Sequence, residues 1–162
     1  MRRRRLLPAV LLALLVAAVP ALARSDREDW PTIDGVQKLH KKDQSGKLVG
    51  TARSDKLLGG HGNDTIEGRD AADVLWGDYK PSGQPSTQRD RISGGGGNDW
   101  IYSSHGWNTI DGGTGDDKIR GREGQGIIDC GGGNDVLYVS HASRKRWTIR
   151  NCETISYRRI NG

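Results

Sequence analysis

The stretch GGGGNDWIY at residues 94–102 has the pattern Gly-Gly-x-Gly-x-Asp-x-aliphatic-x, and residues 112–120 repeat it as GGTGDDKIR. Looser copies fill the chain from Gly50 to Tyr138. The nine blocks begin at Gly50, Gly59, Gly68, Gly77, Gly94, Ser103, Gly112, Gly121 and Cys130. Every block has an aliphatic residue at its eighth position, and seven of the nine have aspartate at the sixth. This region is therefore an array of nine-residue repeats.

Each block combines a turn with a very short strand. Glycines at the first, second and fourth positions allow backbone conformations that other residues avoid. The three residues after the aspartate form a minimal strand with one inward side chain. One block cannot bury its single aliphatic residue alone, so the blocks must stack into an all-β solenoid with a quasi-one-dimensional core. The predicted core column is Leu57, Ile66, Leu75, Ile92, Ile101, Ile110, Ile119, Ile128 and Leu137.

The repeat resembles the RTX, or haemolysin-type, calcium-binding nonapeptide. The resemblance covers residues 50–138, a little over half of the chain, and involves three constrained positions in many copies. It implies a parallel β-roll, with Ca²⁺ as the bound cofactor and aspartates of the sixth position as metal ligands. Those aspartates are Asp55, Asp64, Asp73, Asp90, Asp99, Asp117 and Asp135.

In β-rolls of this family two nonapeptides complete one coil, so the resemblance implies that the turns alternate between two edges of the roll. Neighbours on one edge are then 18 residues apart. Adjacent parallel strands lie about 4.8 Å apart, and calcium to oxygen distances are about 2.4 Å. An ion between two stacked aspartates would therefore reach both, and turn carbonyls would supply the remaining oxygen ligands.

The two edges differ in charge. Edge one carries an unbroken acidic ladder: Asp55, Asp73, Asp99, Asp117, Asp135 and Glu153. Edge two loses its carboxylates along the chain: Asp64, Asp90, Asn108, Gly126 and Arg144. A lone aspartate in such a turn could simply accept backbone amides, but a stacked ladder favours calcium. We expect the strongest sites between Asp99 and Asp117 and between Asp117 and Asp135, and at most one ion on edge two, between Asp64 and Asp90.

Residues 1–23 have the pattern of a secretory signal peptide: four arginines, an apolar stretch and a small-x-small cleavage site at Ala21-Leu22-Ala23. The apolar stretch of about fourteen residues is too short to span a membrane comfortably. Cleavage would reduce the net charge from +5 to 21 bases against 20 acids. The basic composition is therefore no sign of a nucleic-acid partner, and we expect a secreted, extracellular protein without a membrane span.

Three further segments flank or interrupt the repeats. Residues 24–49 show no dependable period, and we expect either a cap on the first rung, formed by Trp30, Ile33 and Val36, or a disordered leader. The insertion at about 79–86 has turn composition and should protrude while leaving the stack in register. Residues 139–162 should form a C-terminal cap, with Arg144 and Arg146 at the carboxylate and core positions of a degenerate block.

The only two cysteines, Cys130 and Cys152, fall in turns on neighbouring rungs. In an exported chain such a pair is expected to be oxidised. The predicted disulfide would join the C-terminal cap to the last regular rung.

The sequence thus predicts a secreted calcium-binding β-roll. The alternative is an adhesive module that binds an extracellular glycan or protein partner through outward aromatic residues, namely Trp76, Trp100 and Tyr102. These rings could instead be covered by the insertion. No Ser-His-Asp arrangement, His-Glu-x-x-His motif or phosphate-binding loop is present. We expect no enzyme activity, because the repeat already accounts for every cluster of carboxylates.

Overall fold

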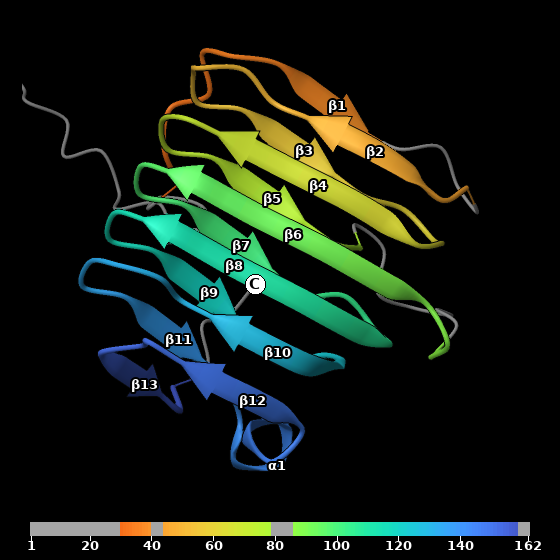
Figure 1. Ribbon diagram of the computed structural model, residues 1–162, viewed down its shortest axis with the longest axis vertical. Helices are drawn as coiled ribbons and strands as arrows, with labels where there is room; N and C mark the ends of the chain where they lie inside the picture. Colours follow the sequence, from red (N-terminus) through yellow and green to blue (C-terminus); the bar gives the residue numbers. More distant parts are fainter. Residues whose placement is uncertain (1–29, 40–43, 79–85, 159–162) are drawn as a thin grey trace, which may run out of the picture.

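The computed structural model describes residues 30–39, 44–78 and 86–158, which form two parallel β-sheets packed face to face (Figure 1). Strands alternate between the sheets along the chain. The odd sheet contains β1 (Gln37–Leu39), β3 (Lys56–Leu58), β5 (Val74–Trp76), β7 (Trp100–Tyr102), β9 (Lys118–Arg120), β11 (Val136–Tyr138) and β13 (Thr154–Ser156). The even sheet contains β2 (Gly46–Val49), β4 (Asp64–Arg69), β6 (Arg89–Gly96), β8 (Trp107–Thr114), β10 (Gln125–Asp129) and β12 (Trp147–Arg150). The predicted all-β parallel roll is confirmed.

The strand register follows the nonapeptide repeat. Leu57 lies opposite Leu75, and Ile119 lies opposite Leu137, so neighbours within a sheet are 18 residues apart. Across the insertion the stack continues without a slip, because Ile66 pairs with Ile92. The predicted loop itself falls almost wholly outside the described residues, which omit 79–85.

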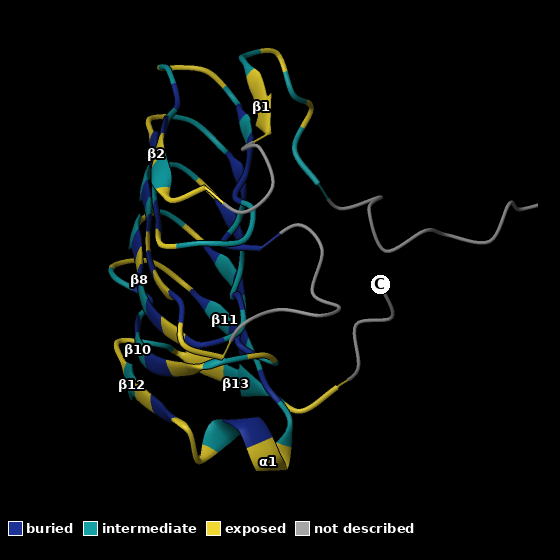
Figure 2. Cartoon of the chain, turned by 90° about the vertical axis from the view of Figure 1, so that its right-hand side faces the viewer, coloured by how far each residue is buried: buried dark blue, intermediate teal, exposed yellow. Residues whose placement is uncertain are grey.

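The core lies between the two sheets, where each strand from β2 to β11 contributes an inward aliphatic side chain, whereas β1 is exposed. Figure 2 shows the buried positions along both sheets. All nine predicted core residues have no exposed surface. Burying one such side chain stabilises the fold by roughly 1.5–3 kcal/mol, but each rung gains this only when its neighbours are in place. The core therefore depends on the stacking of the turns as much as on the strands.

The roll extends beyond the recognisable repeats at its N-terminal end. Leu48 in β2 is buried and pairs with Ile66, which lies one coil later in the chain. This block has lost the aspartate and most of the glycines, so the sequence pattern does not reveal it. Val36 packs against the core beside β1, as expected for a cap, whereas Trp30 lies elsewhere, against Trp76 and Tyr102.

The C-terminal cap corrects one prediction. Trp147 lies opposite Gly126, and Ile149 opposite Ile128, so Arg144 and Arg146 occupy neither the carboxylate nor the core position. The cause is a helical turn, α1 (His141–Arg144), which begins with a capping box between Ser140 and Ser143 and adds three residues before the strand. The following turn is shorter by three residues, which restores the 18-residue spacing.

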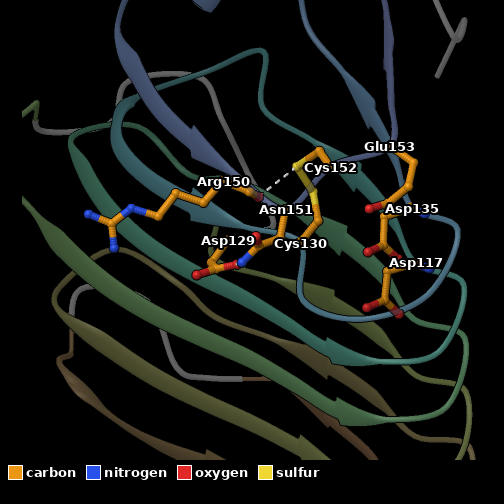
Figure 3. The surroundings of a disulfide bond; sticks show 8 residues. All are labelled: Asp117, Asp129, Cys130, Asp135, Arg150, Asn151, Cys152 and Glu153. Carbon is orange, nitrogen blue, oxygen red and sulfur yellow. Dashed lines mark hydrogen bonds between the residues drawn. A yellow bond between two sulfur atoms is a disulfide. The ribbon is translucent and has the colours of Figure 1, made fainter.

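The predicted disulfide is confirmed. Cys130 and Cys152 are bonded, with their Cα atoms 5.1 Å apart. Next to the bond, Asn151 Nδ2 donates to Asp129 Oδ1 at 2.7 Å (Figure 3). At the same end of the roll, Trp147 Nε1 donates to the Gly121 carbonyl at 2.9 Å. The cap is thus fastened to the last regular rung covalently and by hydrogen bonds.

The expected signal peptide, residues 1–23, lies outside the described residues. Within the described part of the chain, no helix is long and apolar enough to cross a membrane.

Candidate metal centre

The carboxylates of edge one form one continuous column. Asp55, Asp73, Asp99, Asp117 and Asp135 each precede a strand of the odd sheet, and all five are completely buried. One oxygen of each accepts the backbone N–H of the preceding rung: the distances from Asp55 N to Asp73, Asp73 N to Asp99, Asp99 N to Asp117 and Asp117 N to Asp135 are 2.7–2.8 Å. Glu153 continues the column by accepting from Asp135 N at 2.9 Å (Figure 3).

The second oxygen of these carboxylates is the unusual feature. Oδ2 of four consecutive aspartates is buried and receives no hydrogen bond: Asp73, Asp99, Asp117 and Asp135. Among the described residues, these are the only carboxylate oxygens in that condition, and all four are on edge one. A buried anionic oxygen without a partner is costly. Each of them therefore needs a proton or a cation.

In the blocks of Asp73, Asp99 and Asp117 the first residue is a glycine, which leaves space beside that oxygen, whereas the block of Asp135 begins with Cys130. A methyl group on Gly94 would lie 2.2 Å from Asp99 Oδ2 and 2.3 Å from the Gly112 carbonyl oxygen. On Gly68 it would meet Asp73 Oδ2 and the Gly94 carbonyl in the same way, at 2.2 and 2.5 Å. A carboxylate oxygen and a carbonyl oxygen of the next rung thus converge on one small volume, as oxygen ligands of a hard cation do.

The turns before Asp73, Asp99, Asp117 and Asp135 share one backbone conformation. The second and fourth positions of three blocks are glycines with φ between +101° and +149°: Gly95, Gly97, Gly113, Gly115, Gly131 and Gly133. In the block of Asp73 the same positions are Arg69 and Ala71, and they adopt φ of 91° and 69° although both are unfavourable there. Stacking on the neighbouring rungs holds this turn in a conformation that its own residues do not favour.

Burial changes the acidity of the column. Desolvation raises the pKa of Asp73 and Asp117 to about 7 and that of Asp99 to about 8, and it also raises the pKa of Asp135. The backbone N–H received from the preceding rung opposes the shift, whereas the carboxylate of a neighbouring rung adds to it. At neutral pH the column would therefore retain protons unless a cation neutralises it.

Edge two meets its oxygens with the protein's own donors. Asp64 accepts from Gly46 N at 3.1 Å and from Gly60 N at 3.0 Å. Asp90 accepts from Asp64 N at 2.8 Å and from the Ser104 hydroxyl. Desolvation raises the pKa of Asp90 to about 7, which the hydrogen bond from Ser104 opposes. The structure thus brings Asp64 and Asp90 together, as their spacing predicted, but leaves neither with an orphaned oxygen.

The Ser104 side chain fills the space between Asp90 and Asn108 on edge two. Ser104 Oγ lies 2.6 Å from Asn108 Oδ1, and Asn108 Nδ2 donates to the Ser104 carbonyl at 3.0 Å. The space beside Gly77 that corresponds to the open volumes of edge one is filled by Ser104 and Ile92. Sequence reasoning missed Ser104, although serine at a second position, four residues before asparagine at a sixth, is a signal for it.

A second residue missed from the sequence is Thr51. Its backbone N–H and hydroxyl both donate to Asp55 Oδ2, and Thr51 stands at the second position, where three later blocks of edge one have Gly95, Gly113 and Gly131. The first carboxylate of edge one is therefore satisfied by the chain, and the orphaned oxygens begin at Asp73.

Comparison with known proteins agrees with this geometry. The family described as RTX calcium-binding nonapeptide repeat (4 copies) matches residues 49–78, 86–119 and 105–137, together half of the chain. This chain belongs to the RTX repeat family. The family binds Ca²⁺ and is typically structural, and its members are typically secreted. Neither the curated proteins nor the solved structures include a match to this RTX chain.

The donor set of this RTX protein fits Ca²⁺. Among residues 30–39, 44–78 and 86–158, no three His, Cys, Asp or Glu side chains converge as a metal site. Any ion on edge one must therefore combine one or two carboxylates with backbone carbonyls. All-oxygen coordination of that kind suits a hard cation with a high coordination number rather than zinc or copper.

Proposed function

We propose that this protein is an exported β-roll in which Ca²⁺ is structural and is held along edge one. The ligands would come from Asp73, Asp99, Asp117 and Asp135 and from carbonyls of the intervening turns. This gives three intervals with an orphaned oxygen on both sides. Asp55 would contribute less because Thr51 already satisfies it.

The observation that carries the proposal is the confinement of the orphaned oxygens to one edge. Asp64 and Asp90 have the same spacing as the edge-one carboxylates, yet both of their oxygens have protein donors. We therefore expect fewer calcium ligands than the sequence suggested. Edge two holds no ion, because hydrogen-bond donors of the protein take the place that calcium has beside the carboxylates of edge one.

Calcium would act here by neutralising the column and drawing successive turns together. Each rung buries one aliphatic residue in the core, so the free energy gained per rung is small against about 1–2 kcal/mol of backbone entropy per residue. The proposed signal peptide would direct export, so the chain would remain unfolded while calcium is low and would fold after export. We expect no catalytic activity, because every carboxylate of the column serves the stack.

The test is calorimetric titration of the chelated, signal-free protein with Ca²⁺, followed by anomalous scattering from crystals grown with calcium. We expect about three ions, all on edge one. Ions spaced evenly along both edges, or an absence of binding, would refute the assignment.

The second candidate function is binding of an extracellular partner at the outer face of the odd sheet. The structure changes the expected surface: Trp100 is only 7% exposed, and Trp30 packs edge-on against Trp76 and Tyr102 and donates from Nε1 to Tyr102 Oη at 2.8 Å. The aromatic residues are therefore no flat, open platform. The observation that still favours this candidate is a pocket at the margin of these rings.

A further inference from the structure

The last turn of edge one begins with a cysteine, whereas the other turns of this edge begin with glycine. Cys130 takes the first position of the turn before Asp135, where the earlier turns have Gly50, Gly68, Gly94 and Gly112. Cys130 is completely buried and is bonded to Cys152 of the cap, which is half-buried. In Figure 3 this bond lies beside the column of Asp117, Asp135 and Glu153. The disulfide therefore borders the last interval of the candidate metal centre.

The backbone carbonyl of Cys130 faces the same kind of open volume as the carbonyls of the earlier turns. A methyl group on Gly112 would lie 2.1 Å from the Cys130 carbonyl oxygen and 2.6 Å from Asp117 Oδ2. One rung earlier, the Gly112 carbonyl oxygen and Asp99 Oδ2 converge in the same way beside Gly94. Asp117 Oδ2 is one of the buried oxygens without a donor. The Cys130 carbonyl therefore stands at the position of a calcium ligand in the last of the three intervals.

The ligand carbonyls of the earlier intervals are held by the turn that follows each of them. Through β6 and β8 the turn at 94–99 pairs with the turn at 112–117. Gly132 in the next turn hydrogen-bonds to Gly113 and Gly115, with N···O distances of 2.8 and 2.9 Å. The carbonyls of the first two intervals are therefore fixed by hydrogen-bonded backbone on the side of the next rung.

The turn of Cys130 lacks this support, because the turn of the cap that follows it is shorter. Within the described part of the chain, residues 131–134 hydrogen-bond only to the preceding rung. Cys130 itself is attached to the cap by one backbone hydrogen bond, from its N–H to the Arg150 carbonyl at 3.1 Å, and by the disulfide. The covalent bond thus takes the place that hydrogen-bonded backbone has in the earlier turns.

We propose, on the basis of the calcium binding proposed for edge one, that the Cys130–Cys152 disulfide positions the Cys130 carbonyl as a calcium ligand beside Asp117, so that reduction of the bond weakens this one site. In the reduced chain the cap no longer fixes the direction of that carbonyl. Binding at the two sites is reciprocal, so calcium stabilises the disulfide by the same factor by which the disulfide tightens calcium. With export as proposed, oxidation outside the cytoplasm would complete the last site.

The reductant is a dithiol, and the exchange balances. One thiolate of the reagent attacks the sulfur of half-buried Cys152, and Cys130 leaves as a thiolate that takes up a proton. The second thiol of the reagent then closes a cyclic disulfide and releases the thiol of Cys152. Two electrons and two protons pass from the dithiol to the protein.

The test compares oxidised and dithiol-reduced signal-free protein, with circular dichroism at saturating calcium measured first. Calcium affinities are then determined by competition with a chromophoric chelator. After reduction one dissociation constant should rise at least about tenfold, and the others should change by less than about twofold, since coupling between two sites commonly amounts to about 5–150-fold and here acts on one interval.

Two variants and a control locate the effect. Cys152→Ser should reproduce the weakened site and should make the protein insensitive to the dithiol. Anomalous scattering from its crystals, grown at limiting calcium, should show the lowest occupancy between Asp117 and Asp135. Asn151→Gly is the matched control in the same turn: it removes the hydrogen bond to Asp129, accommodates the φ of 50° at this position and keeps the disulfide. This control should bind calcium like the parent protein.

Ile66→Val, which removes one buried methyl group from β4 at the other end of the roll, shows the effect of a general loss of stability. It should single out no site. Reduction that weakens all ions equally, that abolishes the β-sheet signal at saturating calcium, or that changes no affinity would overturn the proposal. An Asn151→Gly variant as impaired as Cys152→Ser would also overturn it, because any loosening of the cap would then suffice. If the oxidised protein binds no calcium, the proposed function itself fails, so the two failures are distinguishable.

Discussion

Edge one and edge two of the roll are built from the same nine-residue repeat, yet the oxygens of their stacked carboxylates have different partners. On edge one the four aspartates from Asp73 to Asp135 each accept the preceding backbone N–H with one oxygen and leave the other buried without a donor. On edge two the second oxygens of Asp64 and Asp90 are met by Gly60 and Ser104. The carboxylates of edge two are satisfied within the chain, whereas the unpaired oxygens of edge one need a proton or, as we propose, a calcium ion. The difference shows that the same repeat can fold in the same way whether its turn carboxylates are satisfied by the protein or need a partner from the solvent.

The largest expected effect is the removal of calcium. Chelation of the signal-free protein should abolish most of the β-sheet signal in circular dichroism, because edge one is then a column of buried carboxylates without counter-charge. Renewed addition of calcium should restore it. An unchanged spectrum and melting temperature in chelator would show that edge one, like edge two, is satisfied by the chain itself.

The next effect separates the edges directly. Asp117→Ala removes a carboxylate shared by two proposed sites, so calorimetry should show the loss of about two ions, and stability should fall by about 3–5 kcal/mol, as when a buried charge loses its partner. Asn108→Ala is the matched control at the equivalent position of edge two.

Asn108→Ala should leave the calcium stoichiometry intact and cost about 1–3 kcal/mol through the lost hydrogen bonds with Ser104. Equal losses of calcium in the two variants would show that the edges do not differ in function.

A pH dependence of the calcium-free protein sharpens the comparison. The pKa values of Asp73, Asp99 and Asp117 are about 7–8 in the fold against 3.8 for the ordinary group. Between these values the folded state binds more protons than the unfolded state, so stability must fall as pH rises from about 4 to 8.

In chelator, the circular dichroism and urea midpoint should therefore indicate more folded protein at pH 5 than at pH 8, whereas with calcium the acid advantage should disappear because protons compete with the ion. A calcium-free protein equally stable at both pH values would contradict the burial of unpaired carboxylates on edge one.

The smallest effect concerns the turn before Asp73, where non-glycine residues adopt the positive φ of the glycine turns. Ala71 has φ of 69°, a conformation that costs a residue with a side chain about 1–2 kcal/mol. Ala71→Gly should raise the unfolding free energy by about 1 kcal/mol and tighten calcium beside Asp73. The adjacent Ala72→Gly, where φ is not positive, should lower stability by about 0.5–1 kcal/mol. If both substitutions destabilise equally, the turn of this rung does not require the left-handed conformation.

The sequence by itself determined the repeat and the aliphatic column, because each is a strict spacing. The alternation of two edges was implied by the resemblance to RTX β-rolls, and the disulfide by the presence of only two cysteines in an exported chain. Ile101, Ile119 and Leu137 share a period of 18, and a strand with one inward residue leaves little freedom in where it can stack. The same counting separated an acidic edge from a decaying one before any contact was known.

Only the tertiary structure decided which carboxylates are already satisfied and where the roll ends. Ser104 and Thr51 are ordinary turn residues in the sequence. Ser104 donates to a carboxylate oxygen of Asp90, which belongs to another turn, and Thr51 donates to Asp55 at the far end of its own turn. Leu48 joins the core without the glycines and aspartate of the motif, since pairing with β4 holds its strand in place. Three residues taken up by α1 moved Arg144 away from edge two. In each case the neighbouring rung, and not the local sequence, sets the conformation.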